Sequence, residues 1–267
     1  MEYKKYSGDS LHLNQESPFF WDHVVRYWWA NEKVKNLDVL DCATGKGYGA
    51  YIMSLSARSV TGIDLNDTSL KVASESFSGQ ENLVFKRQDI FKLEELGKKF
   101  DVITAFEVIE HIDPSKTDEF LSSIKSVLKS DGTLLISTPN HDVVLASGVH
   151  VPSFHINNFK STELKQVLEK HFSNVKMLGQ FKKRTGLQQL IFNLDTFNLR
   201  HKLFKYFKTK KKNGSHPDES ENDHEVIKLQ HLNANDFNQR PSKQMELYSF
   251  SPKHYRQAGL TVAICKI

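Results

Sequence analysis

The sequence predicts an α/β fold with a doubly wound sheet, and two observations support this prediction. Short apolar runs of strand character alternate with segments of helical apolar spacing as far as about residue 139. A glycine-rich segment also follows the first of these runs and leads directly into a helix. Strands that alternate with helices of this length form mainly parallel sheets with helices on both faces.

The elements are predicted in chain order from apolar spacing and capping residues. Asn66 or Asp67 would cap one helix and Ser161 another at their N-termini, and Gly132 would end a helix at its C-terminus. The predicted helices span 19–34, 49–57, 66–78, 115–132 and 161–172. The predicted strands span 37–41, 59–65, 82–89, 100–106, 132–139, 174–181 and 260–265.

Composition divides the chain into three parts. Residues 1–35 would form an N-terminal helical cap, and residues 36–182 together with 246–267 would form the main domain. Residues 183–245 depart from the alternation. They predict a helical, basic insertion that continues into a polar stretch of linker composition before the final strand.

Overall composition indicates an ordinary soluble globular protein, with 39% hydrophobic and 25% charged residues among 267. Cys42 and Cys265 lie in separate apolar runs, so we expect buried thiols in a reducing compartment. The first residues lack a signal-peptide pattern, and no apolar run has membrane-spanning length. We therefore expect a cytoplasmic protein.

The segment "VLDCATGKGYGA" is the most informative stretch. An apolar strand ends at Asp41, and Gly45, Gly47 and Gly49 follow before a helix. Glycines allow a tight turn and close approach of a ligand, and a helix N-terminus offers free N–H groups. The G-x-G-x-G spacing differs from the G-x-G-x-x-G of dinucleotide-binding loops.

Two further acids end the next two predicted strands. Asp64 follows "VTGI" and Asp89 follows "KRQ". Open α/β sheets bind ligands beyond the carboxyl ends of their strands, where these acids and Asp41 would gather. The three acids together with the glycines predict a nucleoside pocket.

These stretches resemble the successive motifs of class I S-adenosylmethionine-dependent methyltransferases. "VLDCATGKGYG", "GIDL", "QDI" and "FDVITAFEVIEHI" occur in the family's order, and the resemblance covers roughly residues 20–180. It implies a Rossmann-like sheet of seven strands whose last strand, 260–265, runs antiparallel. It also implies S-adenosyl-L-methionine as the cofactor. The residues implied to bind it are Asp41, Ala43, Gly45, Gly47, Gly49, Asp64, Leu65, Asp89, Ile90, Phe106 and Glu107.

The resemblance also implies roles within this set. Asp41 and the Gly45–Gly49 loop would hold the methionine part, Asp64 the ribose hydroxyls and Asp89 the adenine amino group. Lys46 stands where many relatives carry an acid or a small residue. It alters the local charge and not the geometry of the loop.

The stretch "FEVIEHI" places Glu107, Glu110 and His111 within a few residues. Carboxylates there would suit a helix N-terminus. At the mouth of a cofactor pocket, however, a titratable cluster favours a functional role. His111 is then the leading general base, because its ordinary pKa lies near 6.5, and Glu110 is the neighbouring carboxylate that would stabilise the charged ring.

A metal site is the alternative for the same residues. The E-x-x-E-H pattern is similar to that of ubiquinone-pathway O-methyltransferases and bacterial small-RNA ribose methyltransferases, which bind a divalent ion there. Two carboxylates and an imidazole suit Mg²⁺, Mn²⁺ or Zn²⁺, and His150 and His155 offer a further ligand. We assign no metal from the sequence and keep a divalent ion as an alternative.

The acceptor is suggested by the region after residue 136. "STPNHDVV" and residues 153–180 resemble methyltransferases encoded with glycan-assembly enzymes, which methylate sugar hydroxyls of surface polysaccharides. His155 matches a histidine of that subgroup and would orient or deprotonate the acceptor, unless it is only a hydrogen-bonded loop residue. The RNA-methyltransferase version lacks its expected basic and aromatic residues in "VPSFHINNF".

The sequence thus predicts O-methylation of a small-molecule or glycan acceptor. A quinone or phenol O-methyltransferase with a metal, N-methylation and an inactive cofactor-binding partner module stay open. The basic amphipathic segment 199–212 would contact an anionic membrane or pack on a partner or on the domain. It lacks the aromatic platform of a nucleic-acid site, so no nucleic acid is expected.

Overall fold

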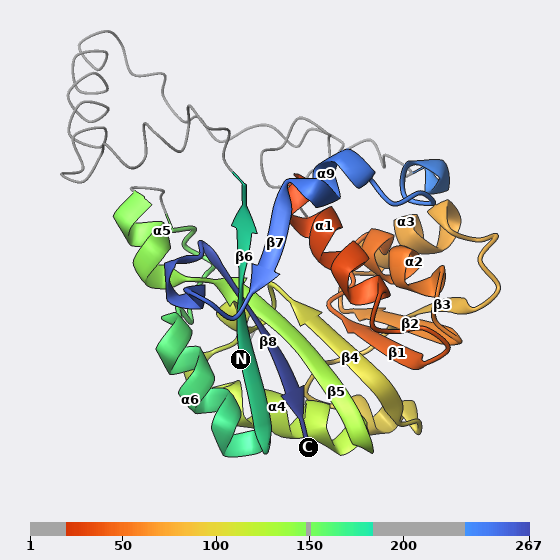
Figure 1. Ribbon diagram of the computed structural model, residues 1–267. Helices are drawn as coiled ribbons and strands as arrows, with labels where there is room; N and C mark the ends of the chain where they lie inside the picture. Colours follow the sequence, from red (N-terminus) through yellow and green to blue (C-terminus); the bar gives the residue numbers. More distant parts are fainter. Residues whose placement is uncertain (1–19, 148–150, 184–232) are drawn as a thin grey trace, which may run out of the picture.

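The computed structural model describes residues 20–147, 151–183 and 233–267 (Figure 1). Within them one sheet runs in the order β3-β2-β1-β4-β5-β8-β6-β7. The strands are β1 Asp38–Cys42, β2 Ser59–Asp64, β3 Leu83–Arg87, β4 Phe100–Phe106, β5 Leu128–Pro139, β6 Asn174–Lys182, β7 Tyr248–Ser251 and β8 Leu260–Lys266. The helices are α1 Phe20–Asn31, α2 Tyr48–Ser54, α3 Asp67–Ser76, α4 Thr117–Val127, α5 His141–Ser147, α6 Ser161–His171 and α9 Ser242–Glu246.

The sheet is parallel from β3 through β5 and antiparallel beyond it. β8 pairs antiparallel with both β5 and β6, which confirms the final antiparallel strand predicted at 260–265. The sheet has eight strands where seven were expected, because the short segment β7 pairs antiparallel with the outer end of β6. The predicted α/β, doubly wound fold class is confirmed.

Helices cover both faces of the sheet, as the alternation of side chains along its strands requires. Val39 of β1 and Val102 of β4 lie in the core cluster with α1 and α2. Their neighbours Leu40 and Ile103 point to the opposite face and pack in the cluster with α4 and α6. Successive strand residues face opposite sides, so both faces are apolar and both need a helical cover.

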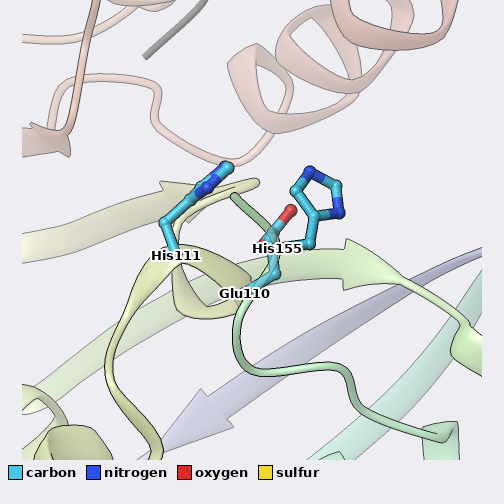
Figure 2. Close-up of side chains that lie close together, drawn as sticks. All are labelled: Glu110, His111 and His155. Atoms are coloured by element: carbon cyan, nitrogen blue, oxygen red, sulfur yellow. The ribbon is translucent and has the colours of Figure 1, made fainter. Parts of the chain in front are cut away.

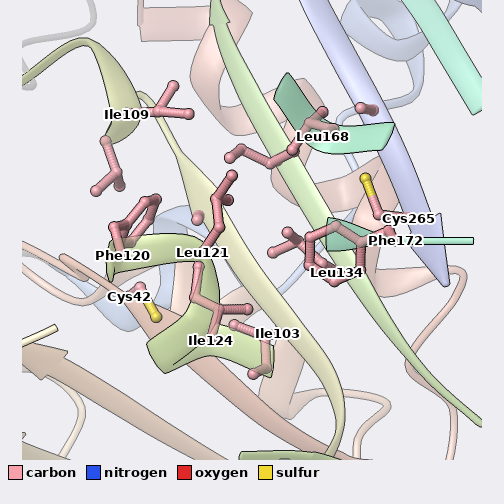
Figure 3. Close-up of a cluster of buried hydrophobic side chains, with 14 of the residues drawn as sticks. Cys42, Ile103, Ile109, Phe120, Leu121, Ile124, Leu134, Leu168, Phe172 and Cys265 are labelled. Atoms are coloured by element: carbon pink, nitrogen blue, oxygen red, sulfur yellow. The ribbon is translucent and has the colours of Figure 1, made fainter. Parts of the chain in front are cut away.

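Figure 3 shows the second of these clusters, between α4, α6 and the sheet. Phe120, Leu121 and Ile124 of α4 are completely buried there. Each such side chain contributes about 1.5–3 kcal/mol on burial, so this layer is a main source of stability. Cys42 and Cys265 are free, buried thiols, as predicted.

Some predicted element boundaries were wrong. The helix expected at 115–132 ends at Val127, and Gly132 lies inside β5 instead of capping a helix. The strand can start early because Leu128 already pairs with Phe100, before an irregularity in the register. Asn66 caps α3 by accepting a hydrogen bond from the Ser69 amide at 3.0 Å.

The helix expected to be capped by Ser161 also begins differently. Ser161 is its first helical residue, and Lys160 precedes it. The Lys160 amide donates to the Glu163 carboxylate at 3.0 Å. Glu163 in the first turn thus accepts from the backbone amide of Lys160, the residue that occupies the N-cap position predicted for Ser161.

The proposed three-part division of the chain stays a prediction. Helix α1 lies within the predicted cap of 1–35, and its buried face packs against α2. Most of the predicted insertion, with the basic segment 199–212, lies outside the described residues, as does His150. Among the described helices, none is long and apolar enough to cross a membrane.

The strand order places the site. From β1 the chain proceeds outward through β2 to β3 and then returns to β4 on the other side of β1. The order of strands therefore reverses between β1 and β4. In open α/β sheets such a reversal leaves a crevice beyond the carboxyl ends of the two strands.

Candidate active site

Asp41, near the end of β1, is completely buried at this crevice. Its carboxylate accepts hydrogen bonds from the hydroxyls of Tyr27 at 3.2 Å, Thr44 at 2.7 Å and Thr104 at 2.6 Å. Burial raises the pKa of Asp41 to about 6, although the three hydroxyls favour the charged form. Through these three hydrogen bonds Asp41 links α1, the glycine loop and β4. Its predicted role toward the methionine part stays a prediction.

The three glycines of the loop have different surroundings. A Cβ on Gly49 would lie 2.2 Å from the Tyr27 ring, and one on Gly47 would lie 2.5 Å from the Phe85 ring. A Cβ on Gly45 would meet nothing within 4 Å, although its φ of +55° is left-handed. Gly49 and Gly47 are therefore needed for packing. Only Gly45 presents open space to a ligand.

Asp64 at the end of β2 and Asp89 after β3 accept hydrogen bonds within their own loops and keep free oxygen lone pairs. Asp64 accepts from the amides of Gly45 at 2.8 Å and Asn66 at 2.9 Å, which links the glycine loop to the end of β2. Asp89 accepts from the Phe91 amide at 2.9 Å.

Both carboxylates are half-buried, so each can accept further hydrogen bonds from a ligand. The three predicted apolar residues next to these acids and Asp41 differ in exposure. Ala43 and Leu65 are exposed, Leu65 to 53%, and Ile90 is half-buried.

Glu107 begins the turn after β4 with a left-handed φ of +56°. Its amide donates to the Ser137 carbonyl at 3.1 Å, and its carboxylate accepts from the Ser137 hydroxyl at 2.8 Å. The same carboxylate oxygen accepts from Arg26 at 3.0 Å. A non-glycine residue in this region costs about 1–2 kcal/mol, and these contacts offset the strain.

Phe106, the last residue of β4, is buried and does not reach an open surface. Its ring lies edge-on to the Tyr27 ring at 5.1 Å. The predicted contact of Phe106 with cofactor or substrate stays a prediction. In the structure its ring is a packing partner of α1.

Arg26 was not predicted as a site residue from the sequence, although it contacts Glu107 and lies beside the end of β4. It belongs to α1, is 1% exposed, and donates to Gln180 of β6 at 3.0 Å and to Ser137 of β5 at 3.0 Å. The available signal was a lone arginine within the apolar run "HVVRYWWA" of a predicted helix. A charged residue on an apolar helix face is rarely buried without a partner.

Glu110, His111 and His155 form a second group of polar residues, on the other side of the β4 terminus. One ligand atom from each residue lies within 4.8 Å of the others. Figure 2 shows the three side chains pointing to the same side, with Glu110 and His111 on the turn after β4 and His155 on the loop before α6. The structure thus brings together the three residues predicted to be catalytic.

The Glu110 carboxylate has an unusual environment. The residue is 1% exposed, and within the described part of the chain neither oxygen has a hydrogen-bond partner of normal geometry. The Thr138 hydroxyl also lacks a hydrogen bond of normal geometry, but it lies close enough to Glu110 to favour the charged form of the carboxyl group. Burial, together with the negative charge of Glu107, raises the pKa of Glu110 well above its usual range.

The two histidines are held so that both rings favour the neutral form. Packing around the partly exposed His111 lowers its pKa, and burial lowers that of His155 to about 4. His111 Nδ1 lies 3.3 Å from the Phe154 carbonyl oxygen, which can only accept. The Nδ1 of the neutral ring therefore carries the proton, and Nε2 keeps a free lone pair.

The predicted metal ligands are only partly brought together. Glu107, Glu110 and His111 were the expected set, but the Glu107 oxygen described above is engaged by Arg26 and Ser137. His155 takes its place beside Glu110 and His111. A carboxylate without partners and two neutral imidazoles fit a divalent ion such as Zn²⁺ or Mn²⁺. The same atoms also fit a base cluster.

Known proteins match parts of this chain. The chain is 29% identical over 173 residues to a Mycobacterium tuberculosis protein named as a probable S-adenosylmethionine-dependent methyltransferase, which covers 63% of this chain and 61% of that protein. It is 30% identical over 111 residues to a ubiquinone biosynthesis O-methyltransferase of Coxiella burnetii, which covers 41% and 46% of the two chains. The chain thus spans about three fifths or less of the length of these relatives.

Solved structures share the fold at low identity. A SAM dependent methyltransferase from Archaeoglobus fulgidus aligns with a TM-score of 0.53 at 18% identity and covers 92% of each chain. The N-methyltransferase NodS from Bradyrhizobium japonicum, in complex with S-adenosyl-l-homocysteine, aligns with a TM-score of 0.53 at 13% identity and covers 67% of this chain and 87% of its own. A family model described as a methyltransferase domain matches residues 33–213. This is more than half of the chain, and the protein therefore belongs to that methyltransferase family.

Proposed function

We propose that the protein transfers a methyl group from S-adenosylmethionine to an acceptor hydroxyl, in particular to a sugar of a surface glycan. The observation that carries the proposal is the arrangement of the crevice between β1 and β4. Gly45 and Asp64 face it from one side, and the neutral His111 lies with Glu110 beyond the end of β4. The Mycobacterium tuberculosis relative, named as a probable S-adenosylmethionine-dependent methyltransferase, supports the same cofactor.

The residues present fit S-adenosylmethionine. Gly45 leaves open space above a left-handed backbone, which suits close approach of a ligand to the loop. Asp64 retains acceptor capacity for ribose hydroxyls after binding two amides. The exposed side chain of Leu65 offers an apolar face to an adenine ring. Asp89 lies after the neighbouring strand, where it would accept from the adenine amino group.

The chemistry requires little beyond alignment and proton removal. S-adenosylmethionine, when bound, supplies an electrophilic methyl group. The protein has to hold the acceptor oxygen in line with it and take the hydroxyl proton. His111 suits the second task, because its Nε2 lone pair is free and its ring is neutral at neutral pH. His155 would orient the acceptor from the facing side, with its ring 4.9 Å from that of His111.

The sugar acceptor rests on the likeness of residues 137–144 and 153–180 to glycan-associated methyltransferases. The contact of segment 199–212 with an anionic membrane is proposed together with it, since a lipid-linked glycan would be presented there. Both proposals concern the acceptor and leave the cofactor side unchanged.

A metal-dependent O-methyltransferase acting on a quinone or phenol is the second candidate. The Glu110 carboxylate favours it, because a buried carboxylate without hydrogen bonds of normal geometry is costly and a cation would compensate its charge. Glu110, His111 and His155 would hold the ion. In that arrangement the ion would polarise the acceptor oxygen and lower the pKa of its hydroxyl.

A thermal-shift experiment tests the cofactor first. S-adenosylhomocysteine should raise the melting temperature of the full chain, because a ligand that binds only the folded state stabilises it. The Asp64→Asn variant should show a much smaller shift, since it loses a carboxylate that accepts ribose hydroxyls. A wild-type protein that shows no shift would contradict the proposal.

Metal binding is tested with the same thermal-shift assay, in the presence of EDTA and with added Mg²⁺, Mn²⁺ or Zn²⁺. A metal-induced shift that disappears in Glu110→Gln would support the second candidate. Methyl transfer that proceeds in EDTA would contradict it. Labelled methyl groups incorporated into a sugar acceptor, and not into a phenol, would support the glycan proposal.

A further inference from the structure

Residues 151–158, the segment before α6, form the surroundings of the His111 ring. The Phe154 carbonyl is the only hydrogen-bond partner of that ring among the described residues, with its oxygen 3.3 Å from Nδ1. The Phe154 ring also lies nearly parallel to the His111 ring, with centroids 5.6 Å apart, and the His155 ring meets it edge-on at 4.9 Å (Figure 2). Two consecutive residues of one segment therefore set both the position of this ring and the nitrogen that carries its proton.

Internal hydrogen bonds make this segment compact. The His155 amide donates to the Pro152 carbonyl at 3.0 Å, and the Asn158 side chain donates to the His155 carbonyl at 2.8 Å. Short-range bonds of this kind hold a loop in one conformation without help from a helix or a sheet. A contact that holds one residue of the segment in place therefore also holds Phe154 and His155.

Asn157 anchors the segment to the turn after β4 and to α4. Its backbone amide donates to the Glu110 carbonyl at 3.0 Å, and its side-chain Nδ2 donates to the hydroxyl of Thr117, the first residue of α4, at 3.0 Å. Asn157 and Thr117 are both buried. Among hydrogen bonds between described residues, this is the only side-chain bond that joins residues 151–158 to another element. Its loss would leave a buried polar group unpaired, which favours release of the segment.

We propose that Asn157 is a positioning residue that, through the segment 151–158, holds His111 in the tautomer protonated at Nδ1. For its catalytic meaning the inference rests on the proposed function, since this tautomer leaves the Nε2 lone pair free to take the acceptor proton. Asn157 itself contacts neither acceptor nor cofactor in this role. Without its side-chain bond the Phe154 carbonyl is no longer held beside His111. The proton can then move to Nε2, where it occupies the lone pair that a base requires.

Nitrogen NMR of the histidine rings tests the inference without a measurement of activity. The full chain, isotopically labelled in its histidine rings and kept in EDTA at neutral pH, should show His111 as a neutral ring protonated at Nδ1. The spectrum of His111→Ala identifies its signals. In Asn157→Ala these signals should shift to those of a ring whose proton exchanges between Nδ1 and Nε2. A wild-type His111 protonated at Nε2, or unchanged His111 signals in Asn157→Ala, would overturn the inference.

Variants of the partner residue assign the effect to this one hydrogen bond. Thr117→Val removes the accepting oxygen with little change of shape and should reproduce the shift of the His111 signals. Thr117→Ser keeps the hydroxyl and should retain the wild-type signals.

Asn82→Ala is the matched control. The Asn82 side chain donates to the carbonyls of Ser54 and Ala57, each at 2.9 Å, just before β3 and away from the His111 turn. Its loss should leave the His111 signals unchanged. The same shift in Asn82→Ala would show that a general loss of stability changes the tautomer, and would overturn the inference.

Kinetics then relate the tautomer to the proposed function. Asn157→Ala should lower kcat of methyl transfer by about ten- to a hundredfold, as expected when a catalytic group is misplaced, and leave the affinity for S-adenosylhomocysteine unchanged. An Asn157 that only stabilised the fold would lower the melting temperature and leave both the tautomer and kcat of the folded variant unchanged. A shifted tautomer with an unchanged kcat would support the inference and contradict the base role proposed for His111. The two failures are therefore distinguishable.

Discussion

Asp41 and Glu110 are both completely buried carboxyl groups at the carboxyl edge of the sheet, yet their surroundings are opposite. Asp41 accepts three hydrogen bonds from hydroxyls of α1, the glycine loop and β4. Glu110 has no partner of normal geometry within the described residues. Burial raises the pKa of both groups.

The difference indicates that Asp41 has a structural role, whereas Glu110 is available for interaction with a ligand. A fully satisfied buried carboxylate stiffens its neighbours, and a ligand would have to break existing hydrogen bonds to engage it. A buried carboxylate without partners is costly in the free protein and gains most when a cation or a proton donor arrives. The hydrogen bonds of Asp41 are therefore complete in the free protein. Those of Glu110 are not, and its carboxyl group can still gain from a bound cation or proton donor.

The largest effect is expected at His111 on the second side. His111→Ala should lower methyl transfer by about 10²- to 10⁴-fold, the usual contribution of a general base, with S-adenosylhomocysteine binding retained. Transfer of labelled methyl groups and calorimetric titration measure the two quantities separately. His171→Ala is the control, because that ring pairs with Asp118 at the N-terminal end of α4. Undiminished transfer in His111→Ala would remove the base role.

The Asp41 side predicts a pH dependence of stability. Its pKa is raised from 3.8 to about 6 in the folded protein, so the folded state binds the proton more tightly than the unfolded state. This contribution to stability is fully present below about pH 4 and is lost as pH rises through 6. At 1.36 kcal/mol per pH unit it amounts to about 3 kcal/mol.

Urea unfolding between pH 4 and 7 measures this contribution. Asp41→Asn should remove that part of the fall in unfolding free energy, although its overall stability is lower because its amide replaces one accepting oxygen. Identical slopes for wild type and Asp41→Asn would show that Asp41 is not protonated in this range. The slope is the readout, since a lost hydrogen bond alone does not change it.

The smallest effect distinguishes two glycines of the loop. Gly49→Ala should lower the free energy of unfolding by about 1–3 kcal/mol, because its Cβ would collide with the Tyr27 ring. Gly45→Ala should cost about 1 kcal/mol through its left-handed φ and weaken cofactor binding instead. Thermal unfolding and titration with S-adenosylhomocysteine compare the pair. A larger stability loss at Gly45 would contradict the different roles assigned to them.

Much of the cofactor side could be predicted from local sequence. Its residues lie in successive segments of the chain, each at or just after the end of a strand: Asp41 with the glycines, then Asp64, then Asp89. Parallel strands bring their carboxyl ends to one edge whatever the remaining sequence is. The final strand had two separate sources, since the apolar run "LTVAIC" indicated a strand and the resemblance to class I methyltransferases implied its antiparallel direction.

The other contacts depend on side chains that are far apart in sequence. Arg26 and Glu107 are 81 positions apart, and Arg26 and Gln180 are 154 positions apart. No spacing rule relates such residues, so the sequence indicated an arginine in an apolar helix and not its partners. The absence of Glu107 from the polar cluster has the same origin, because Arg26 engages the glutamate, whereas His155 was already a candidate from the sequence.

The sequence by itself determined the order of the elements, the edge of the sheet at which the candidate site lies and the residue types gathered there. These follow from local propensity and from the direction of parallel strands. Only the tertiary structure decided which of those residues are satisfied and which are left without partners. Hydrogen-bond satisfaction depends on contacts between distant segments, and burial makes each unmet contact costly.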